Sequence, residues 1–391
     1  MDAAGSVVKS VEPCEQTNAT FKRRPIPLGR RCLYAMIPLL VLVTAGEVVA
    51  RLLVSFDATL PGRFDQIEQI IVFLGNKPGQ SIFEPDPACF WRLRPDVILP
   101  PEGGPSWSGR MSNSHGMRSR EVSVEESQNR TRVLCFGDSS TFAFGVPFDD
   151  AWPNQLQRMF DAEAPDAVEV LNAGIPGQTT YQGRQRLKRE LEKWKPQLAV
   201  ITFGNNDGWR WDGLSDQEHA RRMMVARVCS NLNVSHGLRW LISLRQQAVQ
   251  RLSTEVQLDW AKQATVSYFD PNTKWRPRVD VDEFAANLQA MIRECQNVGC
   301  RPILVVWPDR RQLQNQPTWR PAYQDAMRNV AHEANVTCLD LVPMFESGGQ
   351  WAVDRFLPND VVHLDQVGNE VVSDAVAHVI RKAFHNDVVR R

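Results

Sequence analysis

The sequence lacks the motifs by which proteins commonly hold a nucleotide or a metal ion. It has no Gly-x-x-x-x-Gly-Lys-Ser/Thr loop, no His-Glu-x-x-His motif and no paired Cys-x-x-Cys motif, so no cofactor is predicted. It also lacks an excess of charge, because 45 Lys and Arg balance 45 Asp and Glu over 391 residues. Nucleic acid is therefore not expected as a partner. Internal repeats and low-complexity tracts are absent too, and the 43% of hydrophobic residues are ample for a folded core.

Cysteine is scarce and unpatterned, and it does not settle the redox compartment. The eight cysteines are scattered through the chain. Cys135, Cys295 and Cys338 lie in expected strands or helices, where a thiol behaves as a small apolar side chain. If this part of the chain is extracytoplasmic, Cys300 is the residue to examine for a disulfide, with either Cys295 or Cys338 as its partner.

The N-terminal region combines a basic tail with an apolar stretch. Residues 22–31 carry five Lys and Arg residues ahead of residues 32–56, whose apolar run is interrupted only by Glu47 and Arg51. About 25 helical residues reach about 37 Å, enough to cross a bilayer, and the two charges lie one turn apart, where they can pair. The sequence predicts a transmembrane anchor with a cytoplasmic tail and an extracytoplasmic domain, periplasmic or on the cell surface. A signal peptide cleaved near residues 48–50 and a buried amphipathic helix are the alternatives.

The chain beyond residue 130 alternates short apolar runs with helix-like stretches. This pattern predicts an α/β domain over residues 131–391, with a doubly wound parallel five-stranded sheet between two layers of helices. A helix with a clear apolar stripe is expected over residues 281–296, and a final helix over residues 366–384. The expected strands cover residues 132–136, 168–172, 198–203, 302–307 and 336–341.

Two further regions flank or interrupt this domain. Residues 57–130 are rich in Pro and Gly, and they are predicted to form a packed linker, or prelude, that adds edge strands. Residues 208–279 are predicted to be a helical insertion, either a packed excursion or a wall of the substrate site. In the second case Trp209 and Trp211 would stack on a sugar ring and Arg210 would face an anionic group.

The most informative segment is Thr-Arg-Val-Leu-Cys-Phe-Gly-Asp-Ser-Ser-Thr at residues 131–141. Its apolar run predicts a buried strand, and Gly137 permits a sharp turn at the carboxyl end, where open α/β sheets bind ligands. Ser139 would then lie at a helix N-terminus, facing a developing negative charge. On its own, a Ser in this position is more often a helix cap than a nucleophile.

Three other segments also follow a strand or open a helix. They are Gly-Ile-Pro-Gly at 174–177, Asn-Asn-Asp at 205–207 and Asp-Val-Val-His at 360–363. Because the carboxyl ends of parallel strands meet at one edge of a sheet, all four segments are expected to converge there.

These four segments, in this order, resemble those of the SGNH or GDSL-type serine hydrolases, and in particular membrane-anchored bacterial members. The resemblance implies a three-layer, flavodoxin-like α/β/α fold with Ser139 as nucleophile. It implies Gly177 and Asn206 as oxyanion-hole residues beside the Ser139 amide, and Asp360 and His363 as acid and base.

The resemblance covers roughly residues 131–384 and includes some departures. In Asn-Ala-Gly-Ile-Pro-Gly the functional glycine aligns with Gly177, and Gly174 is the second choice. Ser140 stands where many members have an apolar residue, and Leu364 follows the histidine where Pro is common. Neither departure removes a reacting group.

The residue types support acyl transfer independently of the family. A serine hydroxyl becomes a good nucleophile when a histidine removes its proton and a carboxylate orients that histidine. The sequence therefore predicts a serine esterase that acts on O-acyl groups of carbohydrate or lipid, with envelope or secreted polysaccharide favoured. The alternatives are a polysaccharide O-acyltransferase with the same catalytic set and a non-catalytic, partner-binding subunit that retains the fold.

Overall fold

The structure of the protein is a computed structural model that describes residues 27–53, 82–86, 88–100, 108–125, 130–210, 213–221 and 276–388. The chain divides into two units, a small one of residues 1–57 and 234–242 and a large one containing the remaining residues.

The described element of the small unit is helix α1, Leu28–Leu53, which contains Pro38. Its Arg51 Nε lies 2.9 Å from Glu47 Oε1, one turn away, so the predicted pairing is present. Within the described ranges, however, no helix has both the length and the apolar character needed to span a membrane. The transmembrane anchor predicted over residues 32–56 is therefore not confirmed.

The large unit is built on a five-stranded sheet with strand order β6-β5-β7-β8-β9, in which every neighbouring pair is parallel. All five predicted strands are confirmed, with their ends shifted by at most two residues. The central strands consist almost entirely of apolar residues because both faces of a parallel sheet are covered by helices. The strands are β5 (Thr131–Gly137), β6 (Val168–Gly174), β7 (Leu198–Thr202), β8 (Arg301–Val306) and β9 (Thr337–Asp340).

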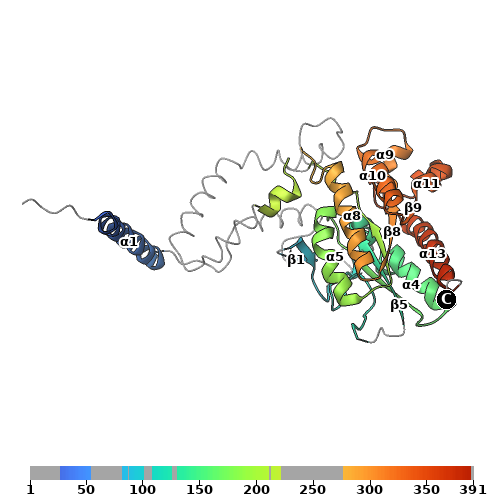
Figure 1. The fold of residues 1–391 in the computed structure, drawn as a ribbon. Coiled ribbons are helices and arrows are strands. Elements are labelled where there is room, and N and C mark those ends of the chain that lie inside the picture. The colour runs from blue at the N-terminus through green and yellow to red at the C-terminus, as the bar shows by residue number, and fades with distance from the viewer. Residues whose placement is uncertain are drawn as a thin grey trace, which may run out of the picture. The chain divides into compact units, whose positions relative to one another are not determined.

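Helices cover both faces of this sheet (Figure 1). On one face α5 (Thr180–Trp194), α8 (Val281–Asn297) and α10 (Arg320–Glu333) contribute to one apolar cluster. On the other face α4 (Trp152–Glu163) and α13 (Gln366–Val388) contribute to a second. The predicted three-layer α/β/α arrangement and the two helices predicted from periodicity are confirmed.

Shorter helices connect these layers. They are α3 (Ser139–Phe142), the 3-10 helix η4 (Phe148–Asp150), α9 (Arg310–Leu313), α11 (Val342–Gly348) and α12 (Gln350–Val353).

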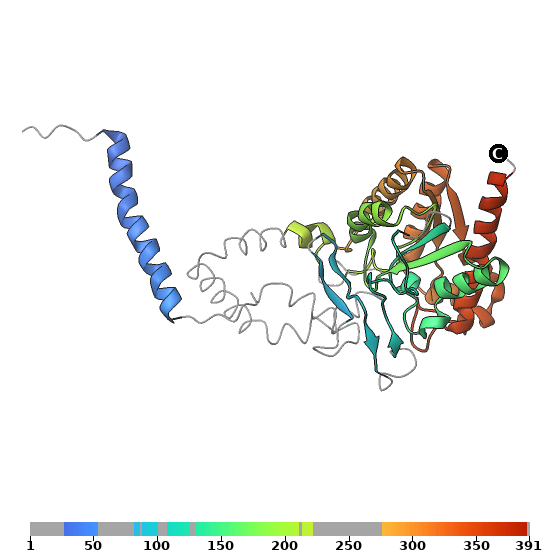
Figure 2. The same cartoon turned by 90° about the horizontal axis from the view of Figure 1, so that it is seen from below.

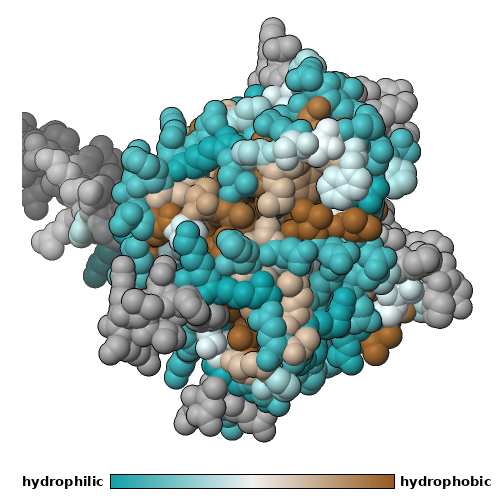
Figure 3. All heavy atoms as spheres, turned by 90° about the vertical axis from the view of Figure 1, so that its right-hand side faces the viewer, coloured by the Kyte–Doolittle hydropathy of each residue, from teal (hydrophilic) through white to brown (hydrophobic). Residues whose placement is uncertain are grey.

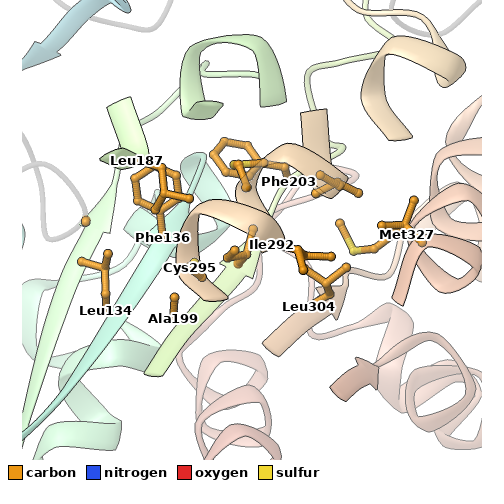
Figure 4. Close-up of a cluster of buried hydrophobic side chains, with 14 of the residues drawn as sticks. Leu134, Phe136, Leu187, Ala199, Phe203, Ile292, Cys295, Leu304 and Met327 are labelled. Atoms are coloured by element: carbon orange, nitrogen blue, oxygen red, sulfur yellow. The ribbon is translucent and has the colours of Figure 1, made fainter. Parts of the chain in front are cut away.

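The apolar residues of the first cluster interdigitate between sheet and helices. Phe136 on β5, Leu187 on α5 and Ile292 on α8 lie close together in Figure 4 and are at most 1% exposed. Cys295 of this cluster is fully buried. Cys295, Cys300 and Cys338 are free thiols. On the molecular face in Figure 3, apolar patches are surrounded by hydrophilic side chains.

The prelude forms two antiparallel hairpins, one of β1 (Phe83–Asp86) and β2 (Phe90–Leu93), the other of β3 (Ile98–Leu99) and β4 (Gly109–Arg110). They lie beside the sheet domain (Figure 2). The expected edge strands are a wrong prediction for the described residues, because each hairpin is its own two-stranded sheet. The prelude instead packs through a third apolar cluster: Ile82, Phe83, Phe90, Trp91, Leu93 and Met111, with Phe142, Ile175 and Trp209 of the sheet domain.

Gly174 sets the distance between β6 and α3. A Cβ at this position would lie 2.1 Å from the backbone nitrogen of Phe142, closer than any real contact. The helix that begins with Ser139 therefore rests directly on the backbone of β6. This glycine is needed for close approach of two backbone segments.

We predict that Gly174→Ala displaces α3 and lowers any activity that depends on Ser139. It should also reduce the free energy of unfolding by about 1–3 kcal/mol, because the added methyl group overpacks a buried contact. Gly299→Ala is the control, since that glycine has a φ of +74° but open space around its Cβ position. The control should lose only stability, by about 1 kcal/mol. Denaturant unfolding and ester turnover measured side by side check this, and full activity of Gly174→Ala would contradict it.

Candidate active site

Ser139 lies just beyond the carboxyl end of β5, the strand between β6 and β7. Gly137 allows the turn, because a Cβ there would lie 2.2 Å from both the carbonyl oxygen of Thr202 and Oγ1 of Thr141. Asp138 caps α3, and its Oδ1 accepts hydrogen bonds from the amide and hydroxyl of Ser140, both at 2.8 Å. The cap is thus Asp138, and Ser139 is the first helical residue, whose amide has no acceptor within the helix.

A continuous chain of hydrogen bonds joins Ser139, His363 and Asp360. Ser139 Oγ lies 2.8 Å from His363 Nε2, although the two residues are 224 positions apart. His363 Nδ1 lies 2.7 Å from Asp360 Oδ2. The other carboxylate oxygen accepts the amides of Val362 and His363 at 2.8 and 2.9 Å. The loop therefore turns back on itself, as the proposed roles require.

This loop is held from outside by residues that the sequence did not single out. The indole of Trp307 donates to the carbonyl of Val362 at 2.8 Å. Arg310 contributes its backbone amide to the carbonyl of Val361 at 2.9 Å. The ring of Phe144 lies 4.9 Å from the His363 ring, centroid to centroid. No sequence signal links these residues to the loop, since the contacts depend on chain segments far apart.

The pKa of Asp360 is lowered to about 2. Burial alone would raise it, but the interaction with His363 and the hydrogen bonds from its ring and backbone outweigh burial. Asp360 is therefore a carboxylate over the working pH range, and it can orient the imidazole and stabilise its protonated form.

The two adjacent asparagines after β7 have different partners. Asn205 Nδ2 donates to both carboxylate oxygens of Asp138, at 3.1 and 3.0 Å. Asn206 Nδ2 instead donates to the carbonyl of Gln178 at 2.9 Å, and the residue is 8% exposed. Asn205 is thus bonded to Asp138, the residue before Ser139, whereas Asn206 is bonded to the loop that contains Gly177.

Two buried carboxylates, Asp138 and Asp207, lie next to the site. Burial raises the pKa of Asp138, against the hydrogen bonds from Ser140 and Asn205. Burial likewise raises the pKa of Asp207 to about 7. Asp207 Oδ1 accepts the amide of Thr180 at 2.9 Å, so it ties the start of α5 to the end of β7.

The glycines of the second motif now have distinct places. Gly174 ends β6 and lies against α3, whereas Gly177 has a φ of +78° in the loop before α5. A positive φ is the backbone conformation that glycine tolerates best. This difference favours Gly177 over Gly174 as the oxyanion-hole residue.

The predicted substrate-binding residues do not form an exposed wall. Trp209 is 7% exposed and belongs to the apolar cluster shared with the prelude, so its ring is a packing element and we withdraw its proposed sugar stacking. Arg210 is half-buried, and Trp211 lies outside the described residues. Most of the insertion, residues 222–275, is also outside the described ranges.

Sequence analysis also missed Trp91 and Arg278. Trp91 donates its indole N–H to the carbonyl of Pro176, and Arg278 donates to that of Gly177. Neither lies in a recognisable motif. In the part of the chain that the structure describes, no group of three or more His, Cys, Asp or Glu is arranged to hold a metal ion.

A serine, a histidine and a carboxylate joined in this order at the carboxyl edge of a parallel sheet are the arrangement of a serine hydrolase site. Residues 135–371 match the GDSL-like Lipase/Acylhydrolase family. The chain belongs to this family.

Known relatives resemble part of the chain. The arylesterase of Vibrio mimicus is 36% identical over 84 residues, which are 22% of this chain and 42% of the relative. Esterase TesA of Pseudomonas aeruginosa is 40% identical over 78 residues, or 20% of this chain and 38% of the relative. The chain thus spans about two fifths of the length of these curated relatives. A lipase/acylhydrolase structure from Enterococcus faecalis has 22% identity and a TM-score of 0.41, covering 65% of this chain and 96% of that one.

We predict that Asp360 contributes about 2 kcal/mol of stability, from a pKa of about 2 against an ordinary 3.8. Because the folded-state pKa is depressed, this contribution is present above about pH 4 and is lost as the pH falls toward 2. Asp360→Asn should therefore have a lower free energy of unfolding than wild type at pH 6. The difference between the two free energies should narrow as the pH is lowered to 3. Urea unfolding across that range measures it. A constant difference between the two proteins would contradict the prediction.

Proposed function

We propose that the protein is a serine esterase that cleaves O-acyl esters through an acyl-Ser139 intermediate. The observation that carries the proposal is the hydrogen-bonded chain from Ser139 through His363 to Asp360. Each atom needed to activate the hydroxyl is within hydrogen-bond distance of the next.

The reaction divides into two steps. Ser139 Oγ attacks the ester carbonyl carbon while His363 Nε2 takes the hydroxyl proton, and the same proton goes to the departing alcohol as the C–O bond breaks. A water molecule then gives one proton to His363 and its hydroxyl to the acyl carbon. The bond from that carbon to Ser139 Oγ breaks, His363 returns the proton to Oγ, and the acid is released. The oxyanion in both steps would be stabilised by the amides of Ser139 and Gly177 and by the Asn206 side chain.

For the acyl-bearing molecule we retain acylated carbohydrate as the favoured class, with lipid as the other. The buried position of Trp209 removes one argument for a sugar. The acyltransferase alternative uses the same residues and differs only in the acceptor, a sugar hydroxyl in place of water. An assay that follows both products therefore decides between them.

Ser139→Ala should lose at least about three orders of magnitude of turnover on a short-chain aryl ester, because the nucleophile is removed. It should also lose labelling by a fluorophosphonate. Ser373→Ala is a matched control, since Ser373 is equally buried but lies on α13 and contacts Met159. Acid release and acylated sugar should both be followed, with and without a sugar acceptor.

The outcomes separate the candidates. Acid release that is unaffected by the acceptor supports the esterase, and acylated sugar formed at its expense supports the transferase. A wild-type chain that neither turns over the ester nor reacts with the fluorophosphonate would support the partner-binding subunit and overturn the esterase.

We further propose that the hydrolase domain is extracytoplasmic. The support is the charge asymmetry of the sequence, in which the basic tail of residues 1–31 precedes the apolar stretch of residues 32–56. A protease added outside the cytoplasmic membrane should digest the chain beyond residue 57 and spare roughly the first thirty residues. Protection of the whole chain in intact cells, with digestion after lysis, would contradict this location.

A further inference from the structure

The loop of residues 176–178 is held by three side chains from three separate parts of the chain. Its three successive carbonyls accept hydrogen bonds in turn from Trp91 Nε1 at 3.0 Å, Arg278 Nη1 at 2.7 Å and Asn206 Nδ2 at 2.9 Å. We call this segment the oxyanion loop, because it contains the glycine aligned with the family's oxyanion-hole residue.

The bond from Trp91 acts on the peptide unit that supplies the proposed donor. The carbonyl of Pro176 and the amide N–H of Gly177 belong to the same planar peptide group and point in opposite directions in a trans peptide. Holding that carbonyl therefore fixes the direction of the Gly177 N–H. A donor to the carbonyl also polarises the N–H, because consecutive hydrogen bonds strengthen one another.

Trp91 is itself rigidly placed. It is 1% exposed, and its own carbonyl accepts from the side chain of Gln178 at 2.9 Å, so the hairpin and the oxyanion loop are bonded in both directions. The hairpin turn is closed by Asp86, whose Oδ1 accepts the amide of Cys89 at 3.1 Å. Asp86 Oδ2 lies 3.0 Å from Arg189 on α5. The β1–β2 hairpin is thus fixed to the helix that follows the oxyanion loop.

Arg278 holds the next peptide group in the same way. Its guanidinium is 1% exposed and pairs with Asp216 through two contacts of 2.9 and 3.0 Å, which leaves Nη1 to donate to Gly177. Asp216 precedes residues 222–275 and Arg278 follows them. Their ion pair joins the two flanks of this segment, and the bond from Arg278 to Gly177 connects these flanks to the oxyanion loop.

We propose that Trp91, in the prelude and outside the family-matched residues 135–371, is a positioning residue for the oxyanion hole. Its indole N–H holds the carbonyl of Pro176, so that the Gly177 amide faces the oxyanion. The prelude is by this inference part of the catalytic apparatus and not a spacer. The inference rests on the proposed function, since only an acyl-transfer reaction needs this donor.

The test compares two Trp→Phe variants of the full chain. Trp91→Phe keeps an aromatic ring and removes the N–H. Trp194→Phe is the matched control, because Trp194 is 0% exposed and donates its indole N–H to Glu190 on the same helix at 3.1 Å. We expect Trp91→Phe to lower kcat on an aryl ester at least about tenfold with KM changed less than about twofold, because the misplaced donor acts in the transition state. The control should keep kcat. The rate of fluorophosphonate labelling should fall in parallel with kcat for Trp91→Phe only.

If Trp91→Phe does not fold, benzothienylalanine at position 91 gives a second variant, which keeps the shape of the indole and replaces its N–H by sulfur. A kcat equal to that of the control, beside an active wild type, would overturn this inference and leave the esterase proposal standing. So would a loss expressed mainly in KM. A wild-type chain inert toward both ester and fluorophosphonate would overturn both.

Discussion

The hydrogen bond between Ser139 Oγ and His363 Nε2 depends on nearly every other feature of the large unit. This hydrogen bond forms only if β5 places Ser139 at the sheet edge and the loop before α13 places His363 at the same point. One end is fixed by close packing and the other by hydrogen bonds. The serine rests on β6 through Gly174, and the histidine is held by the bonds that its loop makes to Asp360 and Trp307.

The oxyanion loop is held in a different way. Ser139 and His363 are placed by elements inside the family-matched residues 135–371, whereas the oxyanion loop is bonded by residues from three regions. The prelude supplies Trp91, the base of the insertion supplies Arg278, and the end of β7 supplies Asn206. A loop that contains a proline and a glycine with positive φ has little regular structure of its own, so external hydrogen bonds define its course.

This arrangement gives the prelude a role that composition does not reveal. Its Pro-rich sequence suggested a packed linker, and its described residues do pack, through an apolar cluster that includes Trp209. The same cluster explains why Trp209 is not an exposed sugar-stacking residue. A tryptophan this close to Asn206 can face substrate or core, and the neighbouring hairpin decides which.

The sequence by itself determined the parallel α/β fold, the five strands, the helix over residues 281–296 and the four segments that meet at the site. These follow from local signals, because apolar periodicity and strand-to-helix transitions are properties of short stretches of chain. The tertiary structure alone decided the hydrogen-bond partners of Asn205 and Asn206, the different places of Gly174 and Gly177, and the contacts of Trp91, Arg278 and Trp307. Each of these depends on a hydrogen bond or close contact between residues remote in sequence, and no local pattern encodes which remote segment will lie beside a given side chain.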